Sequence, residues 1–321
     1  MQSERIRILI ILFFSLCAPC LGYCQETDTL VNQLDSLREV KQEIGTQPLN
    51  TDQSFYTETT DINLKSYFIL LGSNLKQEVA GPFHSSRKTW TKVGIAALIE
   101  AGLLFLDKPV QREAVKITAD RPALQKTSKY ITDFGGLYEA YTLAAFGLYG
   151  WLFKNNKFQT TTLLASQSYI TGALMQFSLK TLSGRERPNY IDPAIGHPSP
   201  TWKGPFADLG STNSAFPSGH TTVAFAAATV YAMEYRKHII FPIIAYSAAS
   251  LIGISRLTEN RHWVSDVFAG AALGYVTGRQ VVNNYHRYAR LQNEKKRKGT
   301  LSYNLDYSQG VFMGSMTYTF R

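Results

Sequence analysis

The sequence predicts an all-α fold: a six-helix bundle followed by a short C-terminal β-hairpin. The chain has 321 residues, of which 45% are hydrophobic and 18% charged, a composition that supports a sizeable core and excludes a disordered or collagen-like chain. Six apolar stretches follow one another after Lys92, and each is longer than an ordinary strand of about 5 to 6 residues. These stretches are residues 93–106, 137–153, 158–179, 221–233, 239–255 and 264–278.

Residues 1–24 have the pattern of an export signal. Arg5 and Arg7 precede an apolar run that ends near Cys17, and small residues lead from there to Cys24. We expect cleavage after Cys24, which would leave the mature chain in the cell envelope; an uncleaved anchor helix and a lipid-modified Cys24 are the alternatives. All three cysteines lie in this segment. A disulfide framework, a cysteine zinc site and cysteine catalysis are therefore excluded for the rest of the chain.

Residues 25–90 form a predicted polar N-terminal linker segment. Acidic side chains recur between residues 25 and 63, and a short pattern of Leu30, Leu34 and Leu37 has helical spacing. Sustained heptads are absent, which favours a surface helix over a coiled coil. The helical domain is expected to follow, over residues 91–290.

The basic residues gather at one set of predicted helix ends, while a proline-rich loop after Pro188 and the segment before Asp266 occupy the other set. The positive-inside rule would place the basic ends in the cytoplasm. This conflicts with an exported N-terminus followed by three full crossings. Either an early stretch does not span, or the signal is not cleaved and exported, or the bundle does not cross the bilayer. A span needs about 20 apolar residues, and only the stretch 158–179 meets that length comfortably. The basic residues are Lys154, Lys157, Arg236, Lys237, Arg287, Arg290 and the run 295–298.

Residues 291–321 combine this basic run with a predicted β-hairpin. From Leu301 to Tyr307 apolar and polar residues alternate, a Ser-Gln-Gly turn follows, and the alternation resumes as far as Phe320. An isolated hairpin is marginally stable in water. We therefore expect this one to pack on the helices, on a partner chain or against lipid.

Three clusters of polar residues lie at one set of helix ends. Residues 180–188 leave the third stretch, residues 216–220 open the fourth, and residues 255–266 join the fifth to the sixth. Each cluster taken alone has an ordinary structural explanation, such as a helix exit or a cap. Their joint occurrence predicts a single site for a tetrahedral oxyanion.

The chemistry of these clusters suits a phosphoryl group. Lys180, Arg187 and Arg256 are cations at helix ends, where arginine can bind phosphate oxygens with a bidentate fork. Ser218 and Gly219 lie where the fourth helix should begin, so backbone N–H groups and the helix dipole would face a bound anion.

Two histidines complete the predicted site. His262 and Asp266 are four residues apart and share one helix face, so Asp266 can accept a hydrogen bond from one imidazole nitrogen and leave the other free as a nucleophile. His220 is then available as a general acid. We expect Arg185 and Arg261 to be solvated charges without a chemical role. The remaining histidines, His84, His197, His238 and His286, have no spacing typical of a metal site.

The three clusters resemble the signature blocks of the type 2 phosphatidic acid phosphatase and vanadium haloperoxidase superfamily, K-x6-RP, PSGH and SR-x5-H-x3-D. The resemblance covers residues 92 to about 285 and implies an all-helical, metal-independent phosphatase without a cofactor. It also implies that His262 attacks phosphorus to give a phosphohistidine, that Asp266 orients His262, and that His220 is the acid. The implied phosphate-binding residues are Lys180, Arg187, Ser218, Gly219 and Arg256.

The resemblance implies a bacterial envelope enzyme that acts on a phosphorylated lipid. Candidate substrates are a phosphatidate, a phosphatidylglycerol phosphate, a polyprenyl diphosphate and a lipid A phosphate, because the apolar stretches suit a substrate whose tail stays in the bilayer. We expect a membrane protein with its site facing the periplasm. The alternatives are a soluble periplasmic acid phosphatase of broad specificity, a vanadate haloperoxidase and a non-catalytic anion-binding protein. Nucleic acid is not expected as a partner, because lipid headgroups explain the basic run near Lys295 equally well.

Overall fold

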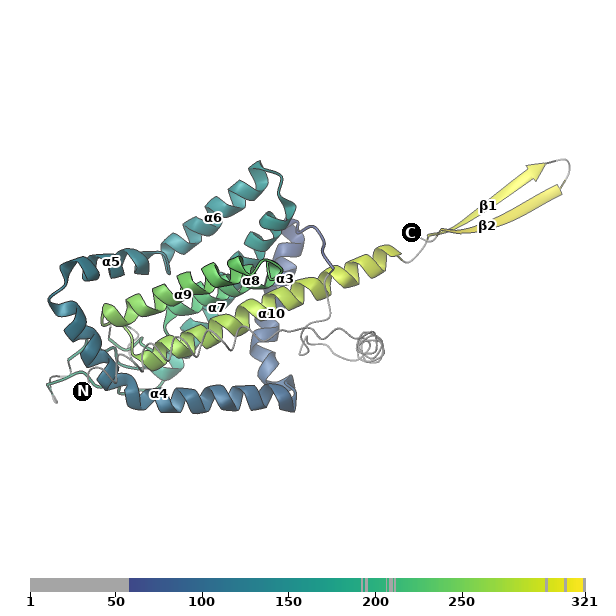
Figure 1. Cartoon of the computed structure of the whole chain (residues 1–321). Helices are drawn as coiled ribbons and strands as arrows, with labels where there is room; N and C mark the ends of the chain where they lie inside the picture. Colours follow the sequence, from purple (N-terminus) through teal and green to yellow (C-terminus); the bar gives the residue numbers. More distant parts are fainter. Residues whose placement is uncertain are drawn as a thin grey trace.

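The computed structural model of the chain describes residues 58–191, 193, 196–205, 207, 210, 212–297, 300–308 and 311–319. The predicted export signal and the linker residues before 58 lie outside the described residues. The described part is mostly helical, as the sequence predicts. It contains eight α-helices, a 3₁₀ helix and two strands (Figure 1). The α-helices are α3 (Leu64–Ala80), α4 (Arg87–Ala119), α5 (Pro122–Asp133), α6 (Leu137–Leu152), α7 (Asn156–Ser183), α8 (Gly219–Glu234), α9 (Ile240–Thr258) and α10 (Val264–Arg297).

The shorter elements connect or follow these helices. The 3₁₀ helix η2 (Gly81–His84) links α3 to α4. At the C-terminal end, β1 (Thr300–Ser308) and β2 (Val311–Thr319) pair antiparallel, in a register that sets Thr300 opposite Thr319 and Ser308 opposite Val311.

Helices α3 and α5 were not predicted as members of the bundle. The six predicted apolar stretches lie within α4, α6, α7, α8, α9 and α10, so the bundle has two more helices than expected. The reason is that both additional helices bury polar side chains. The buried face of α5 consists of Ser128 and Thr132, and that of α3 includes Asn74 and Gln77. Polar side chains at buried positions keep these two helices from forming the long apolar stretches from which the other helices were predicted.

Helix α3 is attached to the bundle by buried amide groups. Asn74 Nδ2 donates to Gln167 Oε1 of α7 at 2.9 Å, and Asn284 Nδ2 of α10 donates to Asn74 Oδ1 at 2.7 Å. Gln77 Nε2 donates to Asn284 Oδ1 at 2.6 Å. Buried polar groups are stable only when they are paired in this way. Part of the predicted linker segment therefore packs as a helix against α7 and α10.

The apolar core lies where α7, α8 and α10 meet. Leu164 of α7, Val230 of α8 and Val281 of α10 are almost completely buried and belong to one cluster. Burying a side chain of this size contributes roughly 1.5–3 kcal/mol each. The three helices that lead to the three predicted motif clusters are thereby held in one rigid unit.

The bundle has two chemically different ends. Helices α7 and α8 run in opposite directions, since Lys157 near the start of α7 lies over the ring of Tyr235 at the end of α8, 4.6 Å from its centroid. His286 of α10 pairs with Glu234 at this same end, at 2.8 Å. The basic helix ends predicted from the sequence therefore meet at one end of the bundle, and the motif clusters lie at the other.

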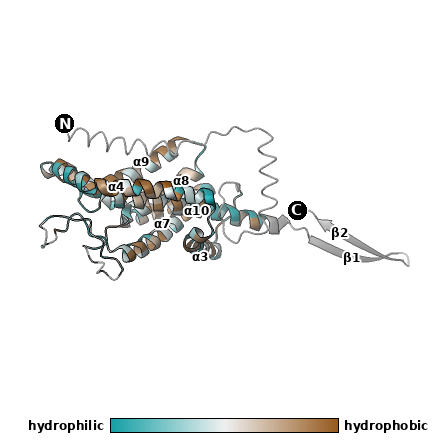
Figure 2. Cartoon of the chain, turned by 90° about the horizontal axis from the view of Figure 1, so that it is seen from below, coloured by the Kyte–Doolittle hydropathy of each residue, from teal (hydrophilic) through white to brown (hydrophobic). Residues whose placement is uncertain are grey.

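Among the described residues, α9 is the helix that is long and apolar enough to cross a membrane. The most apolar 18 of its 19 residues have a mean hydropathy of 1.6, and little of this segment is buried. The sequence had favoured the stretch 158–179 as a membrane span. That part of α7 carries buried polar residues such as Thr161, Gln167 and Ser168, and the helix is not apolar enough to count as a candidate span. Figure 2 shows hydrophobic residues along the bundle helices, with hydrophilic ones on the part of α10 that leaves the bundle.

Candidate active site

A left-handed glycine directs the chain from α7 into the first motif. Lys180 lies in the last turn of α7, and Gly184 ends the helix with φ of +53°. A Cβ atom at Gly184 would lie 2.4 Å from the carbonyl oxygen of Gly204, so only glycine fits this turn. The turn brings residues 185–187 back toward the other two motifs.

Hydrogen bonds join the three motifs to one another. The backbone N–H of Ala215 donates to Arg185 O at 3.0 Å, and that of Ser218 donates to Asp266 O at 2.9 Å. The indole N–H of Trp263 donates to Glu186 O at 2.7 Å. Segments that are up to about eighty residues apart thus converge, as the predicted single site requires.

The ring of His262 is buried and fixed by a backbone carbonyl. Its Nδ1 atom lies 2.7 Å from Ala215 O and 3.7 Å from Asp266 Oδ2, so the carbonyl, and not the predicted carboxylate, is within hydrogen-bond distance. A carbonyl oxygen only accepts, so Nδ1 carries the proton. The Nε2 atom of the neutral ring is then unprotonated and available as a nucleophile.

Asp266 is itself held by two donors. Its Oδ2 accepts the backbone N–H of Trp263 at 2.7 Å, and its Oδ1 accepts Arg185 Nη1 at 2.6 Å. Asp266 is completely buried in the first turn of α10. Asp266 therefore fixes the turn that carries His262 even without a direct hydrogen bond between the two side chains.

The predicted cations lie near enough to both histidines to lower their pKa values. Burial and the nearby cations Lys180, Arg256 and Arg187 hold the pKa of His262 well below its usual range. Burial and the same cations lower the pKa of His220 to about 3. Burial, followed by the charge of Arg187, lowers the pKa of Lys180 to about 8. Such shifts are typical of functional sites.

Two of the arginines are fixed by neighbouring side chains. Arg256 Nη1 donates to Glu259 Oε2 at 2.8 Å and to Thr132 Oγ1 of α5 at 3.2 Å. Arg187 Nη2 donates to Ser214 Oγ at 3.0 Å. In the part of the chain that the structure describes, the Nε atoms of Arg187 and Arg256 are buried and make no hydrogen bond. These N–H groups are the donors that an oxyanion would need.

The start of α8 differs in one respect from the prediction. The backbone N–H of Ser218 is already used by Asp266 O, and its hydroxyl forms a hydrogen bond of 2.9 Å with Thr221 Oγ1. Ser218 is the N-cap residue and Gly219 the first residue of α8. The expectation that both backbone N–H groups face an anion is therefore wrong for Ser218, which can offer only its hydroxyl.

Arg185 was expected to be solvated, and this is wrong. The side chain is completely buried and forms ion pairs with Asp266 of α10 and Asp107 of α4. The sequence offered one signal for Asp107, because it lies seven residues after Glu100 on the same helix face at the end of an apolar stretch. Arg261 is exposed, as predicted.

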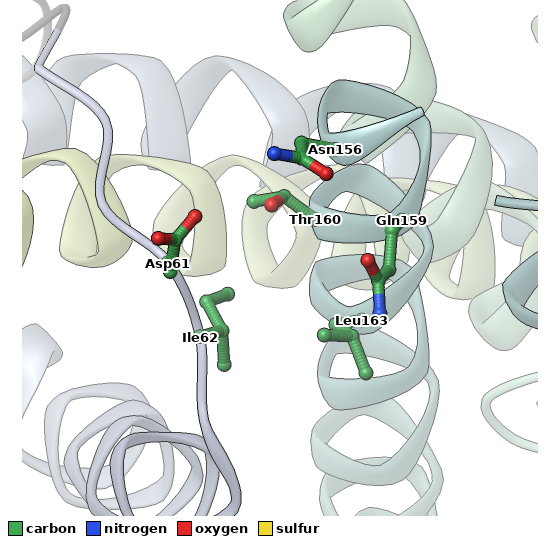
Figure 3. Close-up of a pocket in the computed structure, with 6 residues that line it drawn as sticks. All are labelled: Asp61, Ile62, Asn156, Gln159, Thr160 and Leu163. Carbon is green, nitrogen blue, oxygen red and sulfur yellow. The ribbon is translucent and has the colours of Figure 1, made fainter. Parts of the chain in front are cut away.

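The other histidines lie apart from this cluster. His84, His197 and His238 are exposed, and His286 pairs with Glu234 at the basic end of the bundle. A polar cavity of about 300 Å³ also lies away from the cluster. Figure 3 shows Asp61 and Ile62 facing the first turns of α7 across it. Roughly 30 Å of helix separates these turns from Lys180.

Comparisons with known proteins find a family model and several relatives that are similar to part of the chain. Residues 142–290 match the model described as PAP2 superfamily. The chain is 46% identical over 70 residues to a lipid A 1-phosphatase of Porphyromonas gingivalis, covering 22% of this chain and 16% of that protein. It is 33% identical over 130 residues to lipid phosphate phosphatase 1 of Arabidopsis thaliana, covering 33% of this chain and 38% of that protein. The chain thus spans well under half the length of these relatives.

Two solved structures are also similar. The crystal structure of Aquifex aeolicus LpxE aligns with a TM-score of 0.39 at 23% identity, covering 53% of this chain and 92% of that one. The crystal structure of a transmembrane PAP2 type phosphatidylglycerolphosphate phosphatase from Bacillus subtilis aligns with a TM-score of 0.39 at 19% identity, covering 72% of this chain and 96% of that one.

Proposed function

Since residues 142–290 belong to the PAP2 superfamily, we propose that the chain is a phosphatase that releases phosphate from a lipid phosphate monoester or diphosphate. The observation that carries this proposal is the state of His262. Its Nδ1 proton is held by Ala215 O, and its Nε2 atom is left unprotonated among buried cations. An anion-binding protein needs cations and amides but no such nucleophile, which disfavours the non-catalytic alternative.

The reaction proceeds in two steps. The Nε2 lone pair of His262 attacks phosphorus, the bond to the leaving oxygen breaks, and His220 donates a proton to that oxygen. Water then attacks the phosphohistidine, with His220 accepting a proton from the water, and inorganic phosphate leaves. His220 starts with a lowered pKa. A phosphoryl dianion among the cations offsets their charge and raises this pKa, which prepares His220 to act as the acid.

The cations supply the electrostatic part of catalysis. Lys180, Arg187 and Arg256 hold the phosphoryl oxygens, with Ser218 and Gly219 at the start of α8 contributing further donors. Asp266 acts by fixing the turn that carries His262. No step requires a metal ion.

A lipid substrate is supported by the surface of the bundle and by the names of the relatives. Apolar side chains are exposed on α4, α6 and α9, including Phe105, Trp151 and Ile244. Two relatives are named as phosphatases of lipid A and of lipid phosphates. We propose a membrane protein whose site faces the periplasm, because the basic ends of the helices lie opposite the site. A soluble acid phosphatase is the second candidate, favoured only by the polar faces of α3 and α5.

The decisive test is phosphate release by the wild-type chain and by His262→Ala in detergent. The substrates are phosphatidate, phosphatidylglycerol phosphate, polyprenyl diphosphate, lipid A and a soluble phosphomonoester. We expect His262→Ala to lose at least about 10³-fold in kcat, as nucleophile removal does in other enzymes, with unchanged helical content by circular dichroism. The matched control His238→Ala removes an exposed ring at the opposite end and should keep full activity. Normal turnover by His262→Ala would refute the nucleophile.

A further inference from the structure

Arg185 occupies the centre of a buried ionic network beside the nucleophile. Its Nη1 atom donates to Asp266 Oδ1 at 2.6 Å and to Ser265 Oγ at 2.7 Å, and its Nη2 atom pairs with Asp107 Oδ2. The guanidinium also lies over the ring of Trp202, 4.6 Å from its centroid. All of the side chain is buried.

The network joins three separate parts of the fold. Arg185 belongs to the loop after α7, Asp107 to α4, and Ser265 and Asp266 to the first turn of α10. Asp107 binds that turn a second time, because its Oδ1 atom accepts the backbone N–H of Ser265 at 3.1 Å and the hydroxyl of Ser265 at 2.9 Å. The turn that begins at His262 is therefore held from two sides.

Arg185 contacts both groups that determine the position of the His262 ring. Its side chain holds Asp266, whose other oxygen accepts the backbone N–H of Trp263, the residue after the nucleophile. Its backbone carbonyl accepts the N–H of Ala215, whose own carbonyl binds His262 Nδ1. A displacement of Arg185 would thus reach the nucleophile along two short routes.

We propose that Arg185 and Asp107 are positioning residues, which hold the 262–266 turn so that His262 Nε2 points at the phosphorus atom. This inference rests on the proposed phosphatase function. Both Nη atoms of Arg185 are engaged by carboxylates and a serine hydroxyl, which leaves its buried Nε–H as the donor without a hydrogen-bond partner among the described residues. We therefore assign the binding of phosphate to other cations. Lys180, Arg187 and Arg256 keep that role, so a change at Arg185 should affect turnover rather than phosphate affinity.

The kinetic test compares Arg185→Lys and Asp107→Asn with the wild-type chain. Lysine keeps the charge but cannot bridge two carboxylates with a planar fork. We expect kcat of Arg185→Lys to fall about 10²-fold, the loss that a misplaced reacting group can cause. The inhibition constant for inorganic phosphate should stay within about twofold of the wild-type value, because the phosphate-binding cations are intact. The matched control Arg112→Lys changes an exposed arginine of α4 and should alter neither quantity.

Two kinetic outcomes would overturn the proposal. The first is an unchanged kcat in both variants. The second is a weakened inhibition constant at unchanged kcat, which would make Arg185 a phosphate-binding residue. If Arg185→Lys does not fold, Asp107→Asn carries the same comparison, with an expected loss in kcat of about tenfold, because amide substitution removes one charge but leaves the pair of Arg185 with Asp266.

A spectroscopic measurement tests the positioning without any turnover. In protein labelled with ¹⁵N-histidine, the Nδ1 proton of His262 should give a downfield, slowly exchanging signal that is missing in His262→Ala. We expect this signal to shift or exchange faster in Arg185→Lys and to stay unchanged in Arg112→Lys. An unaltered signal in Arg185→Lys would overturn the positioning role. A wild-type chain with this signal but no phosphate release would instead refute the proposed function, and the comparison of the two variants would still decide the role of Arg185.

Discussion

Lys180 is the residue whose charge state should limit the enzyme at high pH. It lies in the last turn of α7, where burial and then the charge of Arg187 lower its pKa to about 8. Both causes disfavour the protonated form, so its charge is present at pH 7 and is lost as the pH rises through about 8. The loss removes one of the cations that hold the phosphoryl group.

We therefore predict that kcat/KM falls above pH about 8 and that Lys180→Arg moves this fall to higher pH, because a guanidinium stays protonated there. On the acid side, the pKa of His262 lies well below its usual range, so no loss should occur near pH 6.5 beyond that from the second ionisation of the substrate phosphate near pH 6. A pH–rate profile with a soluble phosphomonoester measures both limbs. An identical basic limb in wild-type and Lys180→Arg protein would contradict the assignment to Lys180.

Motif spacing predicts the polar residues of this site but not the groups that support them. The spacing identified Lys180, His220 and His262, which the structure brings together. In the sequence, Arg185 looks no different from an arginine exposed to solvent. Only its burial in the folded chain distinguishes it. Ala215 acts through its backbone carbonyl. A backbone acceptor has no residue-type signature, so no sequence pattern could have selected it.

At the scale of the elements, the packing of α8 against α10 positions the first turn of α8, which carries His220. Gly274 of α10 faces α8 so closely that a Cβ atom there would lie 2.2 Å from Thr222 O. Gly270 and Gly278, one turn before and after it, make similar close approaches. Glycine at every fourth position lets two helix backbones approach in this way. The contact holds the first turns of α8, and with them His220.

We predict that Gly274→Ala lowers the free energy of unfolding by about 1–3 kcal/mol, because the added methyl group overpacks a backbone contact that cannot rearrange locally. The control is Gly102→Ala on α4, where a Cβ atom would meet nothing within 4 Å. That substitution should be neutral, or stabilising by up to about 1 kcal/mol through helix propensity. Thermal or denaturant unfolding in detergent, followed by circular dichroism, measures the difference. Equal stability of the two variants would show that α8 and α10 can separate without cost.

The helices that the sequence predicted are those with long apolar stretches, even where, as in α7, part of the buried face is polar. The stretches 137–153 and 239–255 lie almost entirely within α6 and α9 because Leu, Ile and aromatic residues dominate them. Helix α5 was missed because it packs on α9 through hydroxyl pairs, such as Thr132 with Ser255 at 2.7 Å. The spacing of 270, 274 and 278 was present in the sequence and would have indicated the α8–α10 contact.

At the scale of the whole molecule, the bundle combines a polar interior with an apolar exterior. Buried polar residues such as Gln167, Asp107 and Thr277 lie inside, whereas Phe105 of α4, Trp151 of α6 and Leu251 of α9 are exposed. A soluble protein rarely exposes so many large apolar side chains on neighbouring helices. This distribution is the one expected when lipid is the surrounding solvent, because polar groups are then kept away from the outer surface.

Leu251 offers a sharp test of that placement, because it is half exposed and lies close to the middle of α9, the span candidate. If α9 crosses a bilayer, Leu251→Lys places a charge near its centre at a cost of about 2.5–3.5 kcal/mol, and we predict that the variant is lost from the membrane fraction. If the bundle is soluble, the same exposed substitution should change stability by no more than about 0.5 kcal/mol. The control is Leu291→Lys, an equally apolar and exposed position on the polar end of α10 that should be neutral in either case. Membrane flotation before and after detergent extraction distinguishes the outcomes, and a Leu251→Lys chain that floats and hydrolyses lipid like the wild type would contradict a lipid-facing α9.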